Sequence, residues 1–400
     1  MSNSLSKYFS GIAAKRLSQV EIMPTSNQHE FNGIMEMKEI FGTEKFNFKG
    51  KFILLSDEED KIIEADGGLT WYDARERHAT RTEYRLYYTT NDVIQNSAVG
   101  DLVIIARTSK KSLAVIIAPA NSTSEKQLLW LFGLSEVKNK FIVKDLSDRK
   151  ESLDFSGKYI MSSLGFELEE KEDYLDLILK RFGKKFPTTY EFSDFARSTI
   201  KSSSPIEAPD ETLLVWMERE ELLFRRLEKH IVEEKLQKGF GKKGIDVDDF
   251  IQFSLSVQNR RKSRAGFAFE NHLSKIFDAH DITYSKGKVT ELNKKPDFIF
   301  PSIKDYHNPS FDISLLTFLG VKTTAKDRWR QVLSEAAKVK RKHLITLEPS
   351  ISKNQTDEML SEKLQLVIPS GIFETYSFEQ QKQILTLSTF ISQVLKKQTK

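Results

Sequence analysis

The pattern of apolar residues changes once along the chain, and this change sets the strongest constraint on the fold. Four short runs rich in β-branched and aromatic residues lie in the first third, over residues 51–56, 83–89, 101–107 and 112–118. Residues typical of turns, such as Gly-Gly and Asn-Asp pairs, separate these runs. Short strands at this spacing favour a barrel or a sandwich, and a short apolar helix predicted over 127–134 would close the unit.

From Asp210 onward the apolar period becomes helical. Helices are predicted from Asp210 to about Lys238, from a cap at Asp246 or Asp248 to about Arg260, and over 263–279. Strands are then predicted over 296–300, 315–322, 343–348 and 364–369, with helices over 326–342 and near Asp357. Strand–helix–strand spacing predicts parallel crossovers, so this part of the chain is expected to be α/β.

A chain of 400 residues is too long for one ordinary domain. The periodic pattern weakens and the charges mix after residue 137. We therefore expect an N-terminal domain over 1–150, a linker over 151–172 and a second domain over 173–400.

Composition excludes several classes of protein. No run approaches the roughly 20 apolar residues of a membrane span, and mean hydropathy is −0.43, so no membrane association is expected. The absence of cysteine excludes disulfides, thiolate zinc sites and cysteine nucleophiles, and the seven histidines lack metal-ligand spacing. The N-terminal residues lack the apolar core of a secretory signal, so we expect a cytoplasmic protein.

The basic residues are clustered, although the net charge is only +4. Residues 322–342 contain eight Lys and Arg against two acidic residues, and residues 260–264 contain four cations in five positions. Clustering of this kind favours a nucleic-acid partner.

One constellation predicts chemistry. Asp297 begins one predicted strand and Lys322 ends the next, which is how metal-dependent nucleases place a metal-binding carboxylate and a lysine. This pairing alone is a weak signal, and the usual second carboxylate, two residues before the lysine, is replaced here by Gly320. Glu335, on the predicted helix over 326–342, is the candidate second acid. The alternative is a surface glutamate that pairs with a nearby lysine.

These residues lie in motifs that resemble a known family. The segments NKKPDFIFPSIKDYHNPSF, LGVKTTAKDRWRQVLSEA and NRRKSRAGFAFENHL closely resemble the catalytic domain of EcoRII-type type II restriction endonucleases over about residues 210–370. The resemblance implies a restriction-endonuclease-like PD-(D/E)XK fold of the displaced-acid variant, in which a helix supplies the second acid. It implies that Asp297 and Glu335 bind Mg²⁺, that Lys322 is catalytic, and that Glu270 lies near the metal.

The resemblance also implies how DNA is read. The start of the helix after the lysine would enter the major groove, where Lys326, Asp327 and Arg328 offer hydrogen-bonding groups that suit G·C pairs. Phosphate contacts are expected from four further cations, Arg330, Arg261, Lys262 and Arg264. Trp216 and Arg219 are candidates for a pocket that holds a flipped base, and burial of Trp216 in the helical core is the alternative.

Residues 70–134 resemble the N-terminal effector domain of EcoRII-like enzymes, a DNA-binding β pseudobarrel. Its candidate DNA contacts interleave aromatic residues and arginines, namely Trp71, Tyr72, Arg75, Arg77, Arg81 and Arg85. The alternative is a solvated loop whose arginines pair with neighbouring acidic residues.

The sequence therefore predicts a multidomain, Mg²⁺-dependent type II restriction endonuclease that cuts double-stranded DNA at a short palindrome with a CC/GG core. A palindrome calls for a homodimer through the catalytic domain. A second DNA copy on the N-terminal domain would regulate cleavage, and a cognate DNA methyltransferase would be the genetic partner. Two alternatives stay open: a DNA-binding protein that does not cut, and a nuclease for modified DNA.

Overall fold

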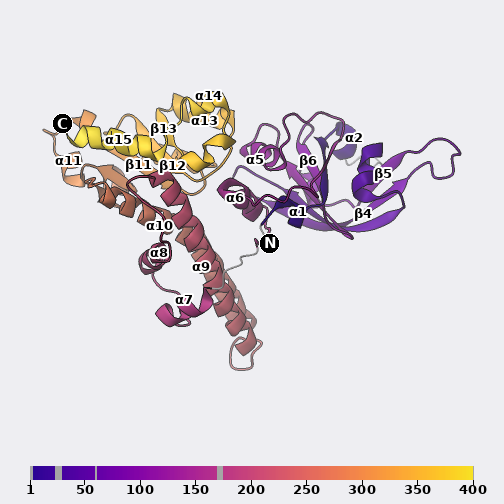
Figure 1. Cartoon of the computed structure of the whole chain (residues 1–400), viewed down its shortest axis with the longest axis horizontal. Helices are drawn as coiled ribbons and strands as arrows, with labels where there is room; N and C mark the ends of the chain where they lie inside the picture. The colour runs from indigo at the N-terminus through magenta and orange to yellow at the C-terminus, as the bar shows by residue number, and fades with distance from the viewer. Residues whose placement is uncertain (1–2, 23–28, 59–60, 169–173, 400) are drawn as a thin grey trace. The chain divides into compact units, whose positions relative to one another are not determined.

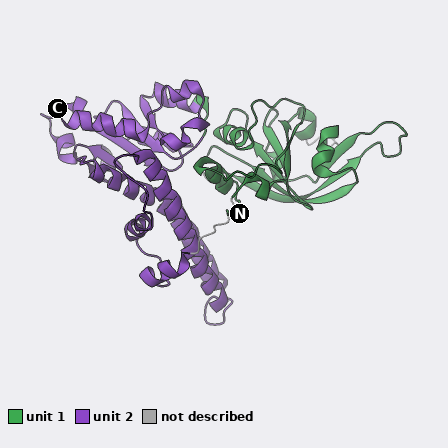
Figure 2. Cartoon of the chain, in the orientation of Figure 1, with its two compact units in different colours: residues 1–168, 350–354 green, residues 169–349, 355–400 purple. Residues whose placement is uncertain are grey.

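The computed structural model describes residues 3–22, 29–58, 61–168 and 174–399. The chain forms two compact units, one of residues 1–168 with 350–354 and the other of residues 169–349 with 355–400 (Figure 2). No helix within the described ranges is both long and apolar enough to cross a membrane.

The first unit is built on an eight-stranded sheet in the order β2-β5-β4-β3-β7-β6-β1-β8 (Figure 1). Neighbouring strands are antiparallel except β3 and β7, which are parallel. The strands are β1 (Gly11–Arg16), β2 (Glu30–Asn32), β3 (Phe46–Leu54), β4 (Ile63–Asp73), β5 (Tyr84–Tyr88), β6 (Leu102–Ser109), β7 (Ser112–Ala118) and β8 (Ile142–Asp145).

The four predicted strands correspond to β3, β5, β6 and β7, and the sequence pattern missed the other four. β4 was missed because its Gly67-Gly68 pair reads as a turn. In the sheet Gly67 lies opposite Gly50, and a Cβ at Gly50 would come within 2.1 Å of Leu69 Cδ1. These glycines therefore serve close strand packing and not a reversal of the chain.

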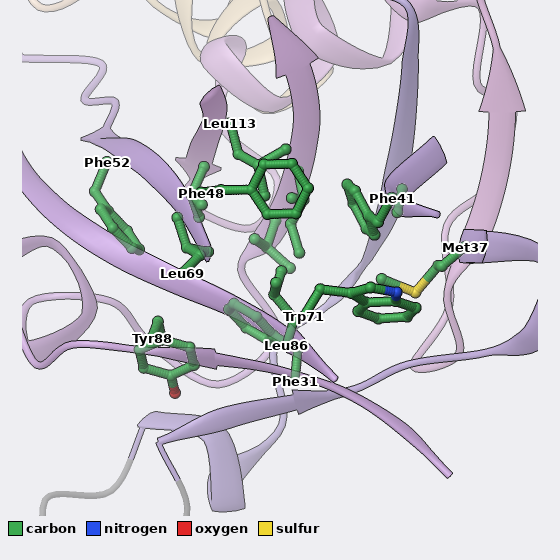
Figure 3. Packing of buried hydrophobic residues seen from close by; sticks show 14 of the residues in the cluster. Phe31, Met37, Phe41, Phe48, Phe52, Leu69, Trp71, Leu86, Tyr88 and Leu113 are labelled. Atoms are coloured by element: carbon green, nitrogen blue, oxygen red, sulfur yellow. The ribbon is translucent and has the colours of Figure 1, made fainter. Parts of the chain in front are cut away.

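Both faces of this sheet are buried. One face holds a cluster in which Trp71 packs near Met37 and Phe41 (Figure 3). This face is curled, because Phe31 on edge strand β2 and Phe141 beside edge strand β8 have ring centroids 6.3 Å apart. The helices of this unit are α1 (Leu5–Tyr8), α2 (Gln19–Ile22), α3 (Lys38–Phe41), α4 (Asp92–Gln95), α5 (Thr123–Phe132) and α6 (Phe155–Ser163).

The other face of the sheet is covered by α5 and α6. Ile160 and Met161 of α6 belong to the buried cluster on this face. Because α6 lies inside the segment predicted as a linker, 151–172, the folded part of the first unit extends further than expected.

The second unit contains a five-stranded mixed sheet in the order β13-β12-β11-β10-β9. Its strands are β9 (Ser285–Lys286), β10 (Phe298–Phe300), β11 (Thr317–Lys322), β12 (Lys342–Thr346) and β13 (Leu364–Val367). The predicted parallel crossovers are confirmed for β11, β12 and β13, whereas β9 and β10 run antiparallel. The helices after residue 174 are α7 (Leu175–Phe182), α8 (Thr189–Ser198), α9 (Pro209–Lys238), α10 (Val247–Ala279), α11 (Ile303–His307), α12 (Trp329–Leu333), α13 (Lys353–Ser361), α14 (Phe378–Gln381) and α15 (Leu387–Gln398).

The two longest described helices, α9 and α10, pack against each other (Figure 1). α9 contains Trp216 and Arg219, and α10 contains the basic cluster over 260–264. Proline at the first position starts α9, and Asp246 caps α10 by accepting a hydrogen bond from the Asp249 N–H at 3.0 Å. The predicted break near residue 260 is wrong, because α10 continues through the basic cluster as one helix.

The predicted helix over 326–342 is also wrong in length. Its helical part, α12, covers only five residues. Lys326 before it has φ of 30° and Ala336 after it has φ of 49°, and both values lie in the left-handed region that a continuous α-helix excludes.

Candidate active site

The two strands β10 and β11 bring Asp297 and Lys322 together. The strands pair with Phe298 opposite Leu319, so the residue before β10 lies beside the end of β11. Asp297 Oδ2 accepts hydrogen bonds from the Val321 N–H at 2.7 Å and from Lys322 Nζ at 3.2 Å. Both side chains are largely buried, with 17% of Asp297 and 13% of Lys322 exposed.

Gly320 lies where the usual second carboxylate would be, and the structure leaves no room for it there. A Cβ on Gly320 would lie 2.9 Å and 3.0 Å from the two γ-carbons of Val332. Helix α12 therefore packs directly on β11 at this point, and the close contact requires glycine. Because α12 packs on β11, the residues that follow α12 lie near Asp297.

Glu335 lies just beyond α12, whose end is held by a 2.6 Å hydrogen bond from Lys342 Nζ to the Leu333 carbonyl. Its Oε2 is buried and has no hydrogen-bond partner among the described residues. Burial, followed by the negative charge of Asp297, raises the pKa of Glu335 to about 7, against the opposing effect of nearby lysines that include Lys322. Because α12 is short, Glu335 lies outside the helix, although the sequence predicted it on a helix over 326–342.

Glu270 joins this group from α10. Burial, and then Asp297, raises the pKa of its carboxyl group, while Lys286 and Lys322 oppose the shift. Lys286 Nζ lies 3.3 Å from Glu270 Oε2. The negative charge of Asp297 thus contributes to the raised pKa of both Glu335 and Glu270. A partly buried Glu335 with no ion pair to a described residue does not fit the alternative of a surface glutamate.

The carboxylate oxygens beside β10 and β11 are of the type that binds a divalent cation. Within the described ranges, no three His, Cys, Asp or Glu side chains are arranged as a group that could hold a metal ion. Asp297 Oδ1 has no hydrogen bond to a described residue, and Glu335 Oε2 is buried and unpaired. Carboxylate oxygens are the ligands that Mg²⁺ prefers, and a cation would offset the repulsion between these carboxylates.

The turn after β11 carries the predicted base-reading residues. Lys326 and Arg328 are half-buried, and Asp327 is exposed. A residue that the sequence did not single out, Glu348, contacts this turn through backbone N–H groups. Arg330 is exposed and makes a two-pronged ion pair with Glu358, at 2.8 Å and 2.9 Å.

The cations of the α10 cluster differ in their surroundings. Arg264 is only 6% exposed and pairs with Glu220 and Glu221 on α9, so its predicted phosphate contact is wrong. Arg261 pairs with Glu228, with Nε and Oε1 2.6 Å apart, and keeps part of its surface exposed. Lys262 is exposed.

The predicted pocket residues lie on α9. Trp216 is 5% exposed and its Nε1 donates to Ser203 Oγ at 3.0 Å, which matches the alternative of a core tryptophan. The Arg219 guanidinium lies over the Tyr174 ring, 4.6 Å from the ring centroid.

In the first unit the predicted DNA contacts divide into three groups. Trp71 is fully buried, stacks on Tyr84 and donates to the Gly42 carbonyl at 2.9 Å, so its predicted DNA contact is wrong. Three others pair with acidic residues: Tyr72 donates to Glu30, and Arg75 and Arg85 pair with Glu83. Arg77 and Arg81 are exposed on the loop between β4 and β5, with no ion pair to any described residue.

Comparison with known proteins finds relatives for the C-terminal part of the chain. Residues 224–391 match the family model described as EcoRII C terminal. The type II restriction enzyme EcoRII of Escherichia coli is 41% identical over 212 residues, which cover 52% of this chain and 51% of that protein. The match thus spans about half the length of this curated relative.

Two solved structures are similar at a lower level. A complex of the restriction endonuclease PspGI with substrate DNA has a TM-score of 0.46 and 18% identity, over 54% of this chain and 94% of that one. Metal-depleted Ecl18kI in complex with uncleaved, modified DNA has a TM-score of 0.46 and 18% identity, over 56% of this chain and 82% of that one. Likeness at this level assigns no residue. The family match and the 41% identity confirm the resemblance seen in the motifs over this part of the chain.

Proposed function

We propose that the chain is a type II restriction endonuclease that cleaves both strands of DNA at a short palindrome with a CC/GG core. The observation that carries this proposal is the grouping of Asp297, Lys322 and Glu335 around β10 and β11, in a domain of a restriction-enzyme family. In this proposal the second unit is a PD-(D/E)XK nuclease of the displaced-acid variant.

Asp297 and Glu335 would hold Mg²⁺, with Glu270 nearby. The bound cation would polarise the scissile phosphate and lower the pKa of the attacking water. Lys322, held against Asp297 Oδ2 at 3.2 Å, is placed to stabilise the negative charge that develops on the phosphate. Partial burial of all three side chains limits competition from bulk water and so strengthens these interactions.

Sequence reading is assigned to the turn after β11. Lys326 and Arg328 would donate to guanine, and Asp327 would accept from cytosine. Arg330, Arg261 and Lys262 are the surface cations placed for phosphate contacts, and they act through charge rather than base identity. One chain offers one such turn, so a homodimer through this domain is needed to read and cut a palindrome.

The first unit is proposed to be an effector-type DNA-binding pseudobarrel. Its curled sheet and the exposed arginines of the β4–β5 loop, Arg77 and Arg81, support this assignment. A second DNA copy bound there would regulate cleavage, and a cognate methyltransferase would protect the host site.

Digestion of unmethylated phage DNA tests the proposal. Discrete fragments with a shared CC…GG core, formed with Mg²⁺ and not with EDTA, are the expected result, and sequencing of the ends gives the site. Short duplexes with candidate sites should be added as effectors in a parallel reaction. Absence of cleavage in both reactions would favour a protein that binds DNA without cutting, and cleavage of modified DNA alone would favour a nuclease for modified DNA.

A further inference from the structure

Glu348 lies just beyond the end of β12, beside the turn that follows Lys322. Its side chain is 1% exposed. Oε2 accepts hydrogen bonds from two successive backbone N–H groups of that turn, from Ala325 at 2.6 Å and from Lys326 at 3.0 Å. One buried carboxylate oxygen thus holds the backbone at the start of the predicted base-reading residues.

The stretch that carries Glu348 is itself held in place. The Thr346 hydroxyl donates to the Thr323 carbonyl at 3.3 Å and accepts from the Glu348 N–H at 3.3 Å. The Tyr376 hydroxyl donates to the Glu348 carbonyl at 2.5 Å. The stretch after β12 therefore contacts the turn at two points, Thr323 and Ala325–Lys326. The hydrogen bond from Tyr376 to the Glu348 carbonyl holds this stretch in place.

The turn needs such support because its backbone is strained. Lys326 has φ of 30°, a left-handed value that residues other than glycine rarely adopt. Strained conformations persist where surrounding contacts hold them, and here the contact is a hydrogen bond to the Lys326 N–H itself.

A carboxylate is a strong hydrogen-bond acceptor for these two backbone N–H groups. A buried carboxylate is costly unless it is hydrogen-bonded, and hydrogen bonds to an ionised acceptor are roughly twice as strong as neutral ones. The same turn leads into α12, which packs on Gly320 through Val332 and is followed by Glu335. Its conformation therefore affects both the reading residues and the approach of Glu335.

We infer that Glu348 is a positioning residue for sequence recognition: its carboxylate holds the backbone of the 325–328 turn in the conformation that presents Lys326, Asp327 and Arg328 to guanine and cytosine. Glu348 itself touches no base. The inference rests on the proposed function, because it assigns a role within the reading of the DNA site.

The test compares two buried carboxylates of the same unit. Asp210 is 4% exposed and accepts backbone N–H bonds from Ser370, Leu387 and Ser388 at 3.0, 2.8 and 2.9 Å, far along the chain from the turn. Glu348→Gln and Asp210→Asn each remove a buried charge and keep one acceptor oxygen, so both are expected to lower thermal stability. Only Glu348→Gln should change recognition.

Binding of the full chain is measured in EDTA to a duplex with the site found by digestion, and to the same duplex with one G·C pair of the core replaced. We expect the ratio of the two affinities to fall about tenfold or more in Glu348→Gln, the size expected for loss of one well-placed base contact. Asp210→Asn should keep the ratio of the wild-type chain. An unchanged ratio in Glu348→Gln would overturn the inference.

A different pattern of affinities is expected if the proposed function is wrong. If the wild-type chain binds both duplexes equally, the 325–328 turn does not read the DNA sequence. The role inferred for Glu348 would then fail together with the proposed function. If Glu348→Gln does not fold, Thr346→Val, which removes the hydroxyl bonded to Thr323, should lower the ratio in the same direction. Hydrogen exchange on the wild-type chain adds a test without substitution: the Ala325 and Lys326 amides should be protected, and exchange at the rate of an open chain would contradict the inference.

Discussion

Removal of the Glu335 charge should stabilise the metal-free protein at alkaline pH. The folded environment raises the pKa of this carboxyl group from 4.5 to about 7. A raised carboxyl pKa means that the folded state holds the proton more tightly than the unfolded chain does. The associated stability is complete below pH 4.5 and is lost as the pH rises to 7 and beyond. One unit of pKa difference corresponds to about 1.4 kcal/mol. Ionisation of Glu335 therefore costs the folded state roughly 3 kcal/mol at pH 8.

Glu335→Gln imitates the protonated form, so its free energy of unfolding should match that of the wild-type chain near pH 4 and exceed it by roughly 3 kcal/mol at pH 8 in EDTA. Urea unfolding of both proteins between pH 4 and 8 measures this difference. In an Asp297→Asn background the difference should shrink, because Asp297 is the second cause of the raised pKa. Added Mg²⁺ should stabilise the wild-type chain at pH 8 and have a smaller effect on Glu335→Gln. A difference that stays constant across the pH range would refute the reasoning.

Four further substitutions test other parts of the second unit. Lys322→Ala should retain specific DNA binding while the cleavage rate falls by orders of magnitude. If binding and cleavage assays show equal losses, Lys322 is a residue for DNA binding or folding and not for catalysis. Arg328→Ala should lose about 1–3 kcal/mol of discrimination at a G·C pair, measured by competition between duplexes, and an unchanged preference would reject its assignment. Gly320→Ala should destabilise the fold by about 1–3 kcal/mol because its Cβ meets Val332, and Val332→Ala in the same chain should restore part of that loss in urea unfolding. Arg264→Ala should cost about 3–5 kcal/mol of stability because it removes the arginine partner of buried Glu220, whose other carboxylate oxygen faces His272 at 3.0 Å, and it should not reduce the salt dependence of DNA binding.

The parts of the site that depend on local pattern could be predicted from the sequence. Asp297 and Lys322 were placed on adjacent strands because each adjoins a short apolar run, and the strands are where the pattern puts them. The absence of a side chain at Gly320 pointed to Glu335, and the structure places Glu335 beside Asp297. The reason for Gly320, its contact with Val332, required the packed helix.

Features that depend on distant contacts could not be predicted. The end of α12 is set by the left-handed backbone of Ala336 and by a bond from Lys342 to Leu333, and neither appears in the apolar period. Arg264 belongs to a run of surface-like cations, yet it is buried because Glu220 faces it from α9. Glu348 offered only a weak signal, an acidic residue directly after a buried strand.

In the proposed function, the carboxylates and the lysine around β10 and β11 form a metal-dependent DNA-cleaving site. This is tested by cleavage of a duplex with the mapped site, in Mg²⁺ and in EDTA, by the wild-type chain, by Glu335→Gln and by Glu362→Gln, which changes an exposed glutamate of the same unit. We predict Mg²⁺-dependent cleavage by the wild-type chain and by Glu362→Gln, and a loss of orders of magnitude in Glu335→Gln with DNA binding retained. Cleavage by Glu335→Gln at the wild-type rate would contradict the claim.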